Sequence, residues 1–217
     1  MALYQKAGWL MLTAVLAAHA AEFPVRHGHW GNACAGTMTV DAAGVRFSGA
    51  AGHAWSWKLE DIRQLVLAPD FIRVVSYESG RLPLEPDRSY TFTGHIPAAE
   101  LDTLLASRMD RRLVLELAQP VGADAWSVPV KHRGRNGGSQ GTLAFGAEGV
   151  VYRTLTRDQA RTWRYTDIRT LSSADAFELT MVTREKDFHF QLKQPIDEAR
   201  YNQLWLQIER QNRRIEP

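Results

Sequence analysis

The chain has 217 residues, of which 45% are apolar and 23% charged, and its formal net charge is +2. This composition excludes a disordered or low-complexity protein, and the length suits one large domain or two small ones. The charge is too evenly balanced to predict nucleic-acid binding, although acidic residues outnumber basic ones over 22–125 and the reverse holds over 126–217.

The first 21 residues have the pattern of a signal peptide. Lys6 precedes an apolar stretch over 7–18, and Ala18 and Ala20 are the small residues that a signal peptidase recognises. An uncleaved membrane anchor would need about 20 apolar residues, and this stretch is shorter. We therefore expect 1–21 to be removed and the mature chain to begin near Glu22. The mature protein is expected to lack a transmembrane segment and to be periplasmic or secreted.

The rest of the chain contains an internal repeat with a spacing of about 105 residues. Four features recur in the same order: a histidine, a Gly-Thr pair, a Gly-Val pair and a Trp-x-x-x-Asp-Ile-Arg-x-Leu run. They lie at His27, 36–37, 44–45 and 57–65 in the first copy, and at His132, 141–142, 149–150 and 163–171 in the second. Features shared by both copies argue for structure, and features of one copy alone indicate where function is to be sought.

In the first copy, alternating apolar and polar residues predict a series of short strands. We expect strands over 23–30, 34–40, 45–48, 55–59, 71–77 and 90–92. A hairpin turn is predicted at 41–44, with Gly44 supplying a positive φ. After a Gly- and Pro-rich loop over 80–87, Pro97 is expected to open a helix that presents Leu101, Leu104 and Leu105 on one face.

The second copy predicts the same order of elements. Strands are expected over 127–132, 163–165, 177–181 and 188–192, with a hairpin around 146–149 and a final helix that Asp197 caps. Between the copies, 113–117 is compatible with an extra strand. The predicted domains are a first repeat over 22–111, a linker containing that strand over 112–125, and a second repeat over 126–217.

One family resemblance follows from these elements. The order is an aromatic residue, Asp-Ile with an apolar residue three positions later, a Phe-x-apolar strand, a Phe-x-Phe strand and a closing helix. It resembles bacterial pleckstrin-homology-like (PH-like) and GRAM-like domains, and the two copies cover most of the mature chain. The resemblance implies a mainly β fold of two small antiparallel β-barrels, each closed by its C-terminal helix. It also implies a tandem binding or scaffolding module without catalytic chemistry, and names no ligand.

The predicted ligand-binding residues are those in which the two copies differ. Lys131, Arg133 and Arg135 lie on a Gly-rich loop, where PH-like domains that bind phospholipid headgroups carry basic residues, and such a loop suits phosphate or carboxylate groups. The corresponding loop of the first copy has His29 and Trp30 instead, and Trp30 is a candidate aromatic contact. A plain solvated loop is the alternative interpretation.

The residues of the repeated run are predicted to be structural. We expect the isoleucines to be buried and the aspartates to accept hydrogen bonds from backbone amides at a bend. These residues are Trp57, Asp61 and Ile62 in the first copy and Trp163, Asp167 and Ile168 in the second.

Three patterns for other chemistry are weak. Ser139 lies in a Gly-x-Ser-x-Gly string with Asp175 and His189 downstream, but the α/β context of a serine hydrolase is missing. His27 and His29 would need a third ligand such as His53 or His95 to hold zinc. Cys34 is the only cysteine, so it is either a small buried residue or a thiol available to another chain.

The sequence therefore predicts an exported, non-enzymatic interaction module without a cofactor or metal. Its expected partner is a protein, an envelope polymer or an anionic headgroup, and no nucleic acid. A structural or self-assembling protein of the cell envelope is the alternative, and a hydrolase is the third hypothesis.

Overall fold

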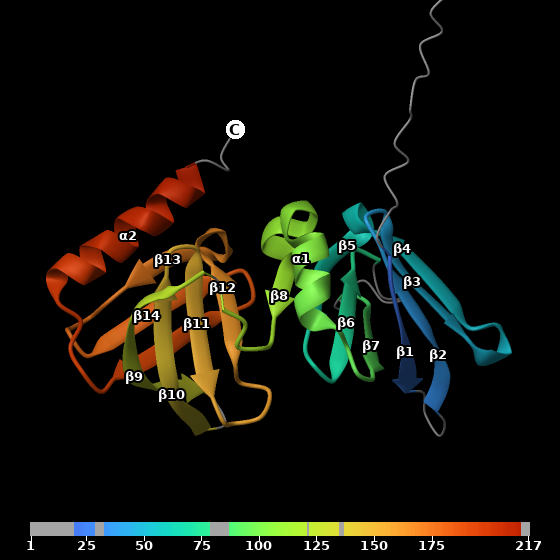
Figure 1. Ribbon diagram of the computed structural model, residues 1–217, viewed down its shortest axis with the longest axis horizontal. Helices are drawn as coiled ribbons and strands as arrows, with labels where there is room; N and C mark the ends of the chain where they lie inside the picture. Colours follow the sequence, from blue (N-terminus) through green and yellow to red (C-terminus); the bar gives the residue numbers. More distant parts are fainter. Residues whose placement is uncertain (1–19, 29–32, 79–86, 121, 135–136, 214–217) are drawn as a thin grey trace, which may run out of the picture.

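The computed structural model describes residues 20–28, 33–78, 87–120, 122–134 and 137–213, and the protein is mainly β with two helices (Figure 1). Seven strands and a helix form the first half. They are β1 (Ala21–Gly28), β2 (Ala33–Val40), β3 (Gly44–Gly49), β4 (Ala54–Lys58), β5 (Ile62–Leu67), β6 (Phe71–Ser76), β7 (Ser89–Thr93) and α1 (Ala98–Met109). A short strand, β8 (Leu113–Leu115), follows.

The second half again has seven strands and a helix. They are β9 (Asp124–Gly134), β10 (Gly137–Gly146), β11 (Gly149–Thr154), β12 (Arg161–Arg164), β13 (Ile168–Ser172), β14 (Glu178–Thr183), β15 (Asp187–Leu192) and α2 (Glu198–Arg213). The hairpins expected from the alternation of apolar and polar residues are therefore confirmed, and so are the two helices expected from apolar residues at helical spacing.

All fifteen strands belong to one open, mixed sheet, so the prediction of two closed barrels is wrong. The strand order is β13-β14-β15-β9-β10-β11-β12-β8-β5-β6-β7-β1-β2-β3-β4. The reason is β8, which pairs with β12 in antiparallel and with β5 in parallel orientation and thereby joins the two halves. β4 and β13 are the two end strands of the sheet. A short 3₁₀ turn follows β4 in the first half, and another precedes β13 in the second.

The duplication is visible in the strand order on each side of β8. The first half runs β5-β6-β7-β1-β2-β3-β4, and the second runs β13-β14-β15-β9-β10-β11-β12 in the same arrangement. The registers agree as well, because Val45 pairs with Trp57 and Val150 pairs with Trp163. Figure 1 shows β8 and α1 in the centre, between the strands of the two halves.

Each half has its own hydrophobic core. Ile62 belongs to the first core and Ile168 to the second, and both side chains have no exposed surface. α1 contacts β8 and β5, whereas α2 lies against β13 and the 3₁₀ turn Tyr165–Asp167. Tyr201 and Asn212 of α2 donate hydrogen bonds to carbonyl groups of β13, so the helix covers an edge of the sheet rather than the end of a barrel.

The glycine at each hairpin has a different role from the one predicted. Gly44 does not have a positive φ. Instead, a Cβ at Gly44 would overlap the carbonyl oxygen of Trp57, and a Cβ at Gly149 would overlap that of Trp163. The recurrence of this glycine therefore reflects the close approach of the neighbouring strand. Among the described residues, no helix is both long and apolar enough to cross a membrane.

Candidate functional site

Both halves of the molecule contribute to a cleft of about 760 Å³. Six of the residues around it are arginines, and Glu209 is the one carboxylate among the described residues that line it. We call this the arginine cleft and define it by Arg63, Arg111, Arg112, Arg169, Arg184 and Arg213, with Gln64, Tyr77, Thr170, Glu209 and Asn212 as the other lining residues.

The repeated Asp-Ile-Arg run places one arginine from each half in the cleft. Ile62 begins β5 and Ile168 begins β13, and both are buried. Because successive side chains of a strand point to opposite faces, the next residue, Arg63 or Arg169, is exposed. The same alternation that fills the two cores therefore supplies cations to the cleft.

Four of the six arginines have no carboxylate partner within the described part of the chain. Arg63 forms an ion pair with Asp87, and Arg213 lies 4.0 Å from Glu209. Arg111, Arg112, Arg169 and Arg184 form no ion pair with any described residue. The cleft consequently has an excess of positive charge, although the whole chain is nearly neutral.

Hydrogen bonds hold the two arginines that follow α1 in place. Arg112 donates through Nη1 to the carbonyl oxygens of Leu59 and Ile62, at 2.8 and 2.9 Å. Arg111 donates through Nη2 to Oδ1 of Asn212 at 2.7 Å, and its buried Nε has no hydrogen-bond partner. A buried donor without a partner costs free energy, so an acceptor supplied by a ligand would be favoured at this position.

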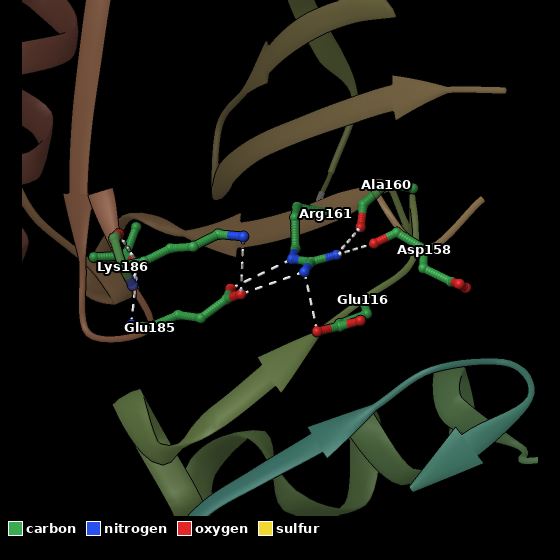
Figure 2. Close-up of polar contacts among 7 residues, drawn as sticks. Glu116, Asp158, Ala160, Arg161, Glu185 and Lys186 are labelled. Carbon is green, nitrogen blue, oxygen red and sulfur yellow. Dashed lines mark hydrogen bonds and ion pairs between the residues drawn. The ribbon is translucent and has the colours of Figure 1, made fainter. Parts of the chain in front are cut away.

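A second group of charges lies next to the cleft but is already satisfied (Figure 2). Arg161 is buried: it donates two hydrogen bonds to Glu185 at 3.3 Å and two to the backbone carbonyls of Asp158 and Ala160, and it forms an ion pair with Glu116 at 3.0 Å. Burial raises the pKa of Glu116, an effect that Arg161 opposes and Glu185 reinforces. Because Arg161 is buried and paired with two carboxylates, this group ties the segment after β8 to the second half rather than forming a binding site.

A further ion pair joins the halves on the side of α1. Arg164 of β12 contacts the largely buried Asp102 of α1, and Gln119 also donates to Asp102 at 3.4 Å. Together with the Arg161 group, this contact fixes β12 against the first half, and the arginine cleft therefore has a defined shape.

The residues predicted to bind ligand lie elsewhere. Lys131 and Arg133 are exposed on β9, and Arg133 is 3.3 Å from Glu178. His29, Trp30 and Arg135 lie outside the described residues. None of the described members of this predicted set lines the arginine cleft.

The structural residues differ between the copies in detail. Trp57 and Trp163 are both buried. Asp167 is also buried and accepts a hydrogen bond from the backbone N–H of Arg164 at 2.8 Å, whereas Asp61 is exposed and the backbone N–H of Tyr77 donates to its carbonyl group.

The residues of the hydrolase and metal hypotheses are not brought together. The buried Ser139 pairs with the hydroxyl of Tyr152, while His189 lies 3.1 Å from Thr180. His27 pairs with the carbonyl oxygen of Thr91. In the described residues, no group of three or more His, Cys, Asp or Glu side chains is placed to hold a metal ion.

Comparisons with known proteins add no family. No family model and no curated protein matches the chain. Among solved structures, the C-terminal domain of an unknown protein from Leishmania infantum matches with a TM-score of 0.33 and 15% identity, over 40% of this chain and 84% of that one. The Spt16D Pob3N heterodimer matches with a TM-score of 0.35 and 11% identity, over 82% of this chain and 99% of the other. At such low TM-scores, neither likeness bears on the fold or function of this chain.

Sequence reasoning missed the arginine cleft, although part of its signal was present. The repeated run contains Arg63 and Arg169 as well as the aspartates and isoleucines, and an exposed residue that recurs in both copies is a candidate for a joint site. No pattern in the sequence connects Arg111 and Arg184 to this pair, because only the pairing of β8 with β5 and β12 brings the segments together. Arg213, at the end of α2, also lines the cleft.

Proposed function

We propose that this protein is an exported, non-enzymatic binding module and that the arginine cleft binds an oxyanion-bearing ligand. The observation that carries the proposal is the convergence of Arg111, Arg112, Arg169 and Arg184, none with a described carboxylate partner, on one cleft of about 760 Å³. The ligand is expected to be an anionic component of the cell envelope.

The physical argument is one of charge and geometry. Guanidinium groups at close range repel one another, and a bound oxyanion removes that repulsion. The planar fork of arginine also matches phosphate, sulfate and carboxylate groups with paired hydrogen bonds. Arg111 and Arg112 are already held by Asn212, Leu59 and Ile62, so little conformational entropy is lost when they bind.

The family relationship is part of the same proposal. Two halves with the same strand order, each followed by a helix, support a duplicated module related to PH-like domains. The proposed binding site lies between the copies and not on the basic hairpin of the second copy.

The experiment measures binding of a fluorescein-labelled heparin oligosaccharide, a sulfated polyanion, by fluorescence anisotropy. The double variant Arg169→Gln/Arg184→Gln is expected to bind at least about tenfold more weakly, because two charge-assisted contacts are lost. The matched control, Arg26→Gln/Arg108→Gln, removes the same charge from exposed positions outside the cleft and should bind as the parent protein does.

A third variant compares the two candidate surfaces. Lys131→Gln/Arg133→Gln removes two exposed charges of β9 and should leave binding unchanged. Equal weakening in all three variants would mean that only net charge matters, and the cleft would then be rejected as the site.

Export is proposed on the strength of the N-terminal pattern. Ala21 is buried and is the first residue of β1, where it pairs with Val40. Cleavage after Ala20, one residue before the boundary expected from the sequence, would leave this strand whole, so we expect the protein isolated from its native host to begin at Ala21. Mass spectrometry of the intact protein tests this, and a chain that still begins at Met1 would contradict it.

A further inference from the structure

The arginine cleft is built from equivalent positions of the two halves. Arg63 and Arg169 directly follow the equivalent isoleucines of β5 and β13. On the neighbouring strands, Ser76 pairs with Ile62 and Thr183 pairs with Ile168. The residues after these two, Tyr77 and Arg184, both line the cleft, so each half contributes a matching wall.

The two walls differ in charge. In the first half, the charge of Arg63 is met by Asp87, and the second position is the neutral Tyr77. In the second half, Arg169 and Arg184 have no carboxylate partner among the described residues. Uncompensated charge on the first-half side comes instead from Arg111 and Arg112, which follow α1.

One side chain connects a member of each pair of arginines. Asn212 of α2 accepts a hydrogen bond from Arg111, and its Nδ2 donates to the carbonyl oxygens of Ile168 and Arg169, each at 3.2 Å. The side chain of Arg111 and the backbone of Arg169 are therefore joined through a single amide in the wall of the cleft.

From this arrangement we propose that the ligand carries at least two linked phosphate groups and bridges the two halves. One group binds Arg111 and Arg112, and the other binds Arg169 and Arg184. A phosphate group carries about 1.5 to 2 negative charges at neutral pH, so a single one compensates only about half of the four arginines. This inference rests on the proposed function of the cleft and specifies the valence of its ligand.

The test uses inorganic probes that differ in the number of linked phosphates. Binding of sodium orthophosphate, pyrophosphate and tripolyphosphate to the full protein is measured by isothermal titration calorimetry at one constant ionic strength, because salt screens exposed charges. We expect the dissociation constant to fall at least about tenfold from orthophosphate to tripolyphosphate, since the second group adds charge-assisted contacts.

Variants of the two arginine pairs separate bridging from simple attraction. In Arg169→Gln/Arg184→Gln, both exposed positions change, so the fold should be retained, and tripolyphosphate should bind no more tightly than orthophosphate. Arg111→Gln, which keeps a donor for Asn212, changes the first-half pair instead. It should also reduce the difference in affinity between tripolyphosphate and orthophosphate. Thermal melting identifies any variant that does not fold. If Arg111→Gln does not fold, Arg169→Gln/Arg184→Gln alone tests whether the ligand bridges the two halves.

The outcomes distinguish this inference from the proposed function. If orthophosphate and tripolyphosphate bind equally well and the cleft variants weaken both, the cleft binds anions but bridging is wrong. If Arg26→Gln/Arg108→Gln lowers the tripolyphosphate advantage as much as the cleft variants do, bridging is also wrong. If no phosphate probe binds but the labelled heparin oligosaccharide does, the inference fails and the proposed function stands; if neither binds, both fail.

Discussion

Four equivalent positions of the two halves have the same backbone pairing, and three of them differ in chemistry. His27 pairs with Cys34 and Phe47 pairs with Trp55 in the first half. The corresponding pairs in the second half are His132 with Ser139 and Tyr152 with Arg161. Three of these four positions have therefore changed from an apolar or weakly polar side chain to a strongly polar one.

The first half fills these positions with ring contacts. The rings of His27 and Trp55 lie 5.0 Å apart, and those of Phe47 and Trp55 lie 5.5 Å apart. The second half fills them with hydrogen bonds: the Tyr152 hydroxyl donates to the Ser139 carbonyl at 2.9 Å, and Arg161 binds its two carboxylates. The same strand order therefore accommodates either ring contacts or hydrogen bonds and ion pairs at these positions.

The largest expected effect concerns what the halves share. Ile62→Asp and Ile168→Asp each place an unpaired charge in a fully buried position, at a cost of roughly 5 kcal/mol, which is enough to unfold a marginal domain. Circular dichroism during urea unfolding measures the loss. Because one sheet joins the halves, we expect each variant to show a single transition, and retention of one folded half would show that the cores are independent.

The next effect concerns the buried Arg161, which replaces the tryptophan of the first half. Arg161→Met leaves Glu116 without its ion-pair partner and Glu185 with Lys186 alone, and should lower the free energy of unfolding by about 3 kcal/mol. The triple variant Arg161→Met/Glu116→Leu/Glu185→Met should recover most of this loss, since it removes the buried carboxylates as well. Urea unfolding measures both variants. A triple variant with a lower free energy of unfolding than Arg161→Met would contradict the explanation.

A smaller effect is expected for the hydroxyl pair of the second half. Tyr152→Phe introduces the residue found at the equivalent position, Phe47, and leaves the buried Ser139 hydroxyl without its acceptor. The expected cost is about 1 kcal/mol. Adding Ser139→Cys, which completes the first-half pair, should restore part of it. Thermal melting compares the two variants. A double variant that melts at a lower temperature than Tyr152→Phe would argue against the equivalence of this pair with Phe47 and Cys34.

The smallest expected effect is a change in pH dependence. Burial raises the pKa of Glu116 above its usual value of 4.5, so the folded protein takes up this proton more readily than the unfolded chain. Its contribution to stability is therefore complete below about pH 4.5 and is lost as the pH rises through the raised pKa. Glu116→Gln should lack this component, so the stability of the parent protein relative to the variant should fall as pH rises above 4.5. Urea unfolding across that range measures it, and a constant difference would show that Glu116 does not titrate there.

Local patterns predicted most of the elements and failed for their assembly. Alternation over the chain indicated the hairpin of β2 and β3, and the spacing of Leu101 and Leu105 indicated α1. The closed barrels were wrong because β8, a strand of three residues, pairs with both halves, and nothing in a segment so short specifies its partners.

The sequence by itself determined the duplication, the β-rich character of each copy and the isoleucines of the two cores, because each depends on residues close together in the chain. Only the tertiary structure decided that the copies share one sheet and that Arg63, Arg111, Arg169 and Arg184 face one cleft. The physical reason is that a site between two halves depends on contacts across about a hundred residues of chain, and long-range pairing leaves no periodicity in the sequence.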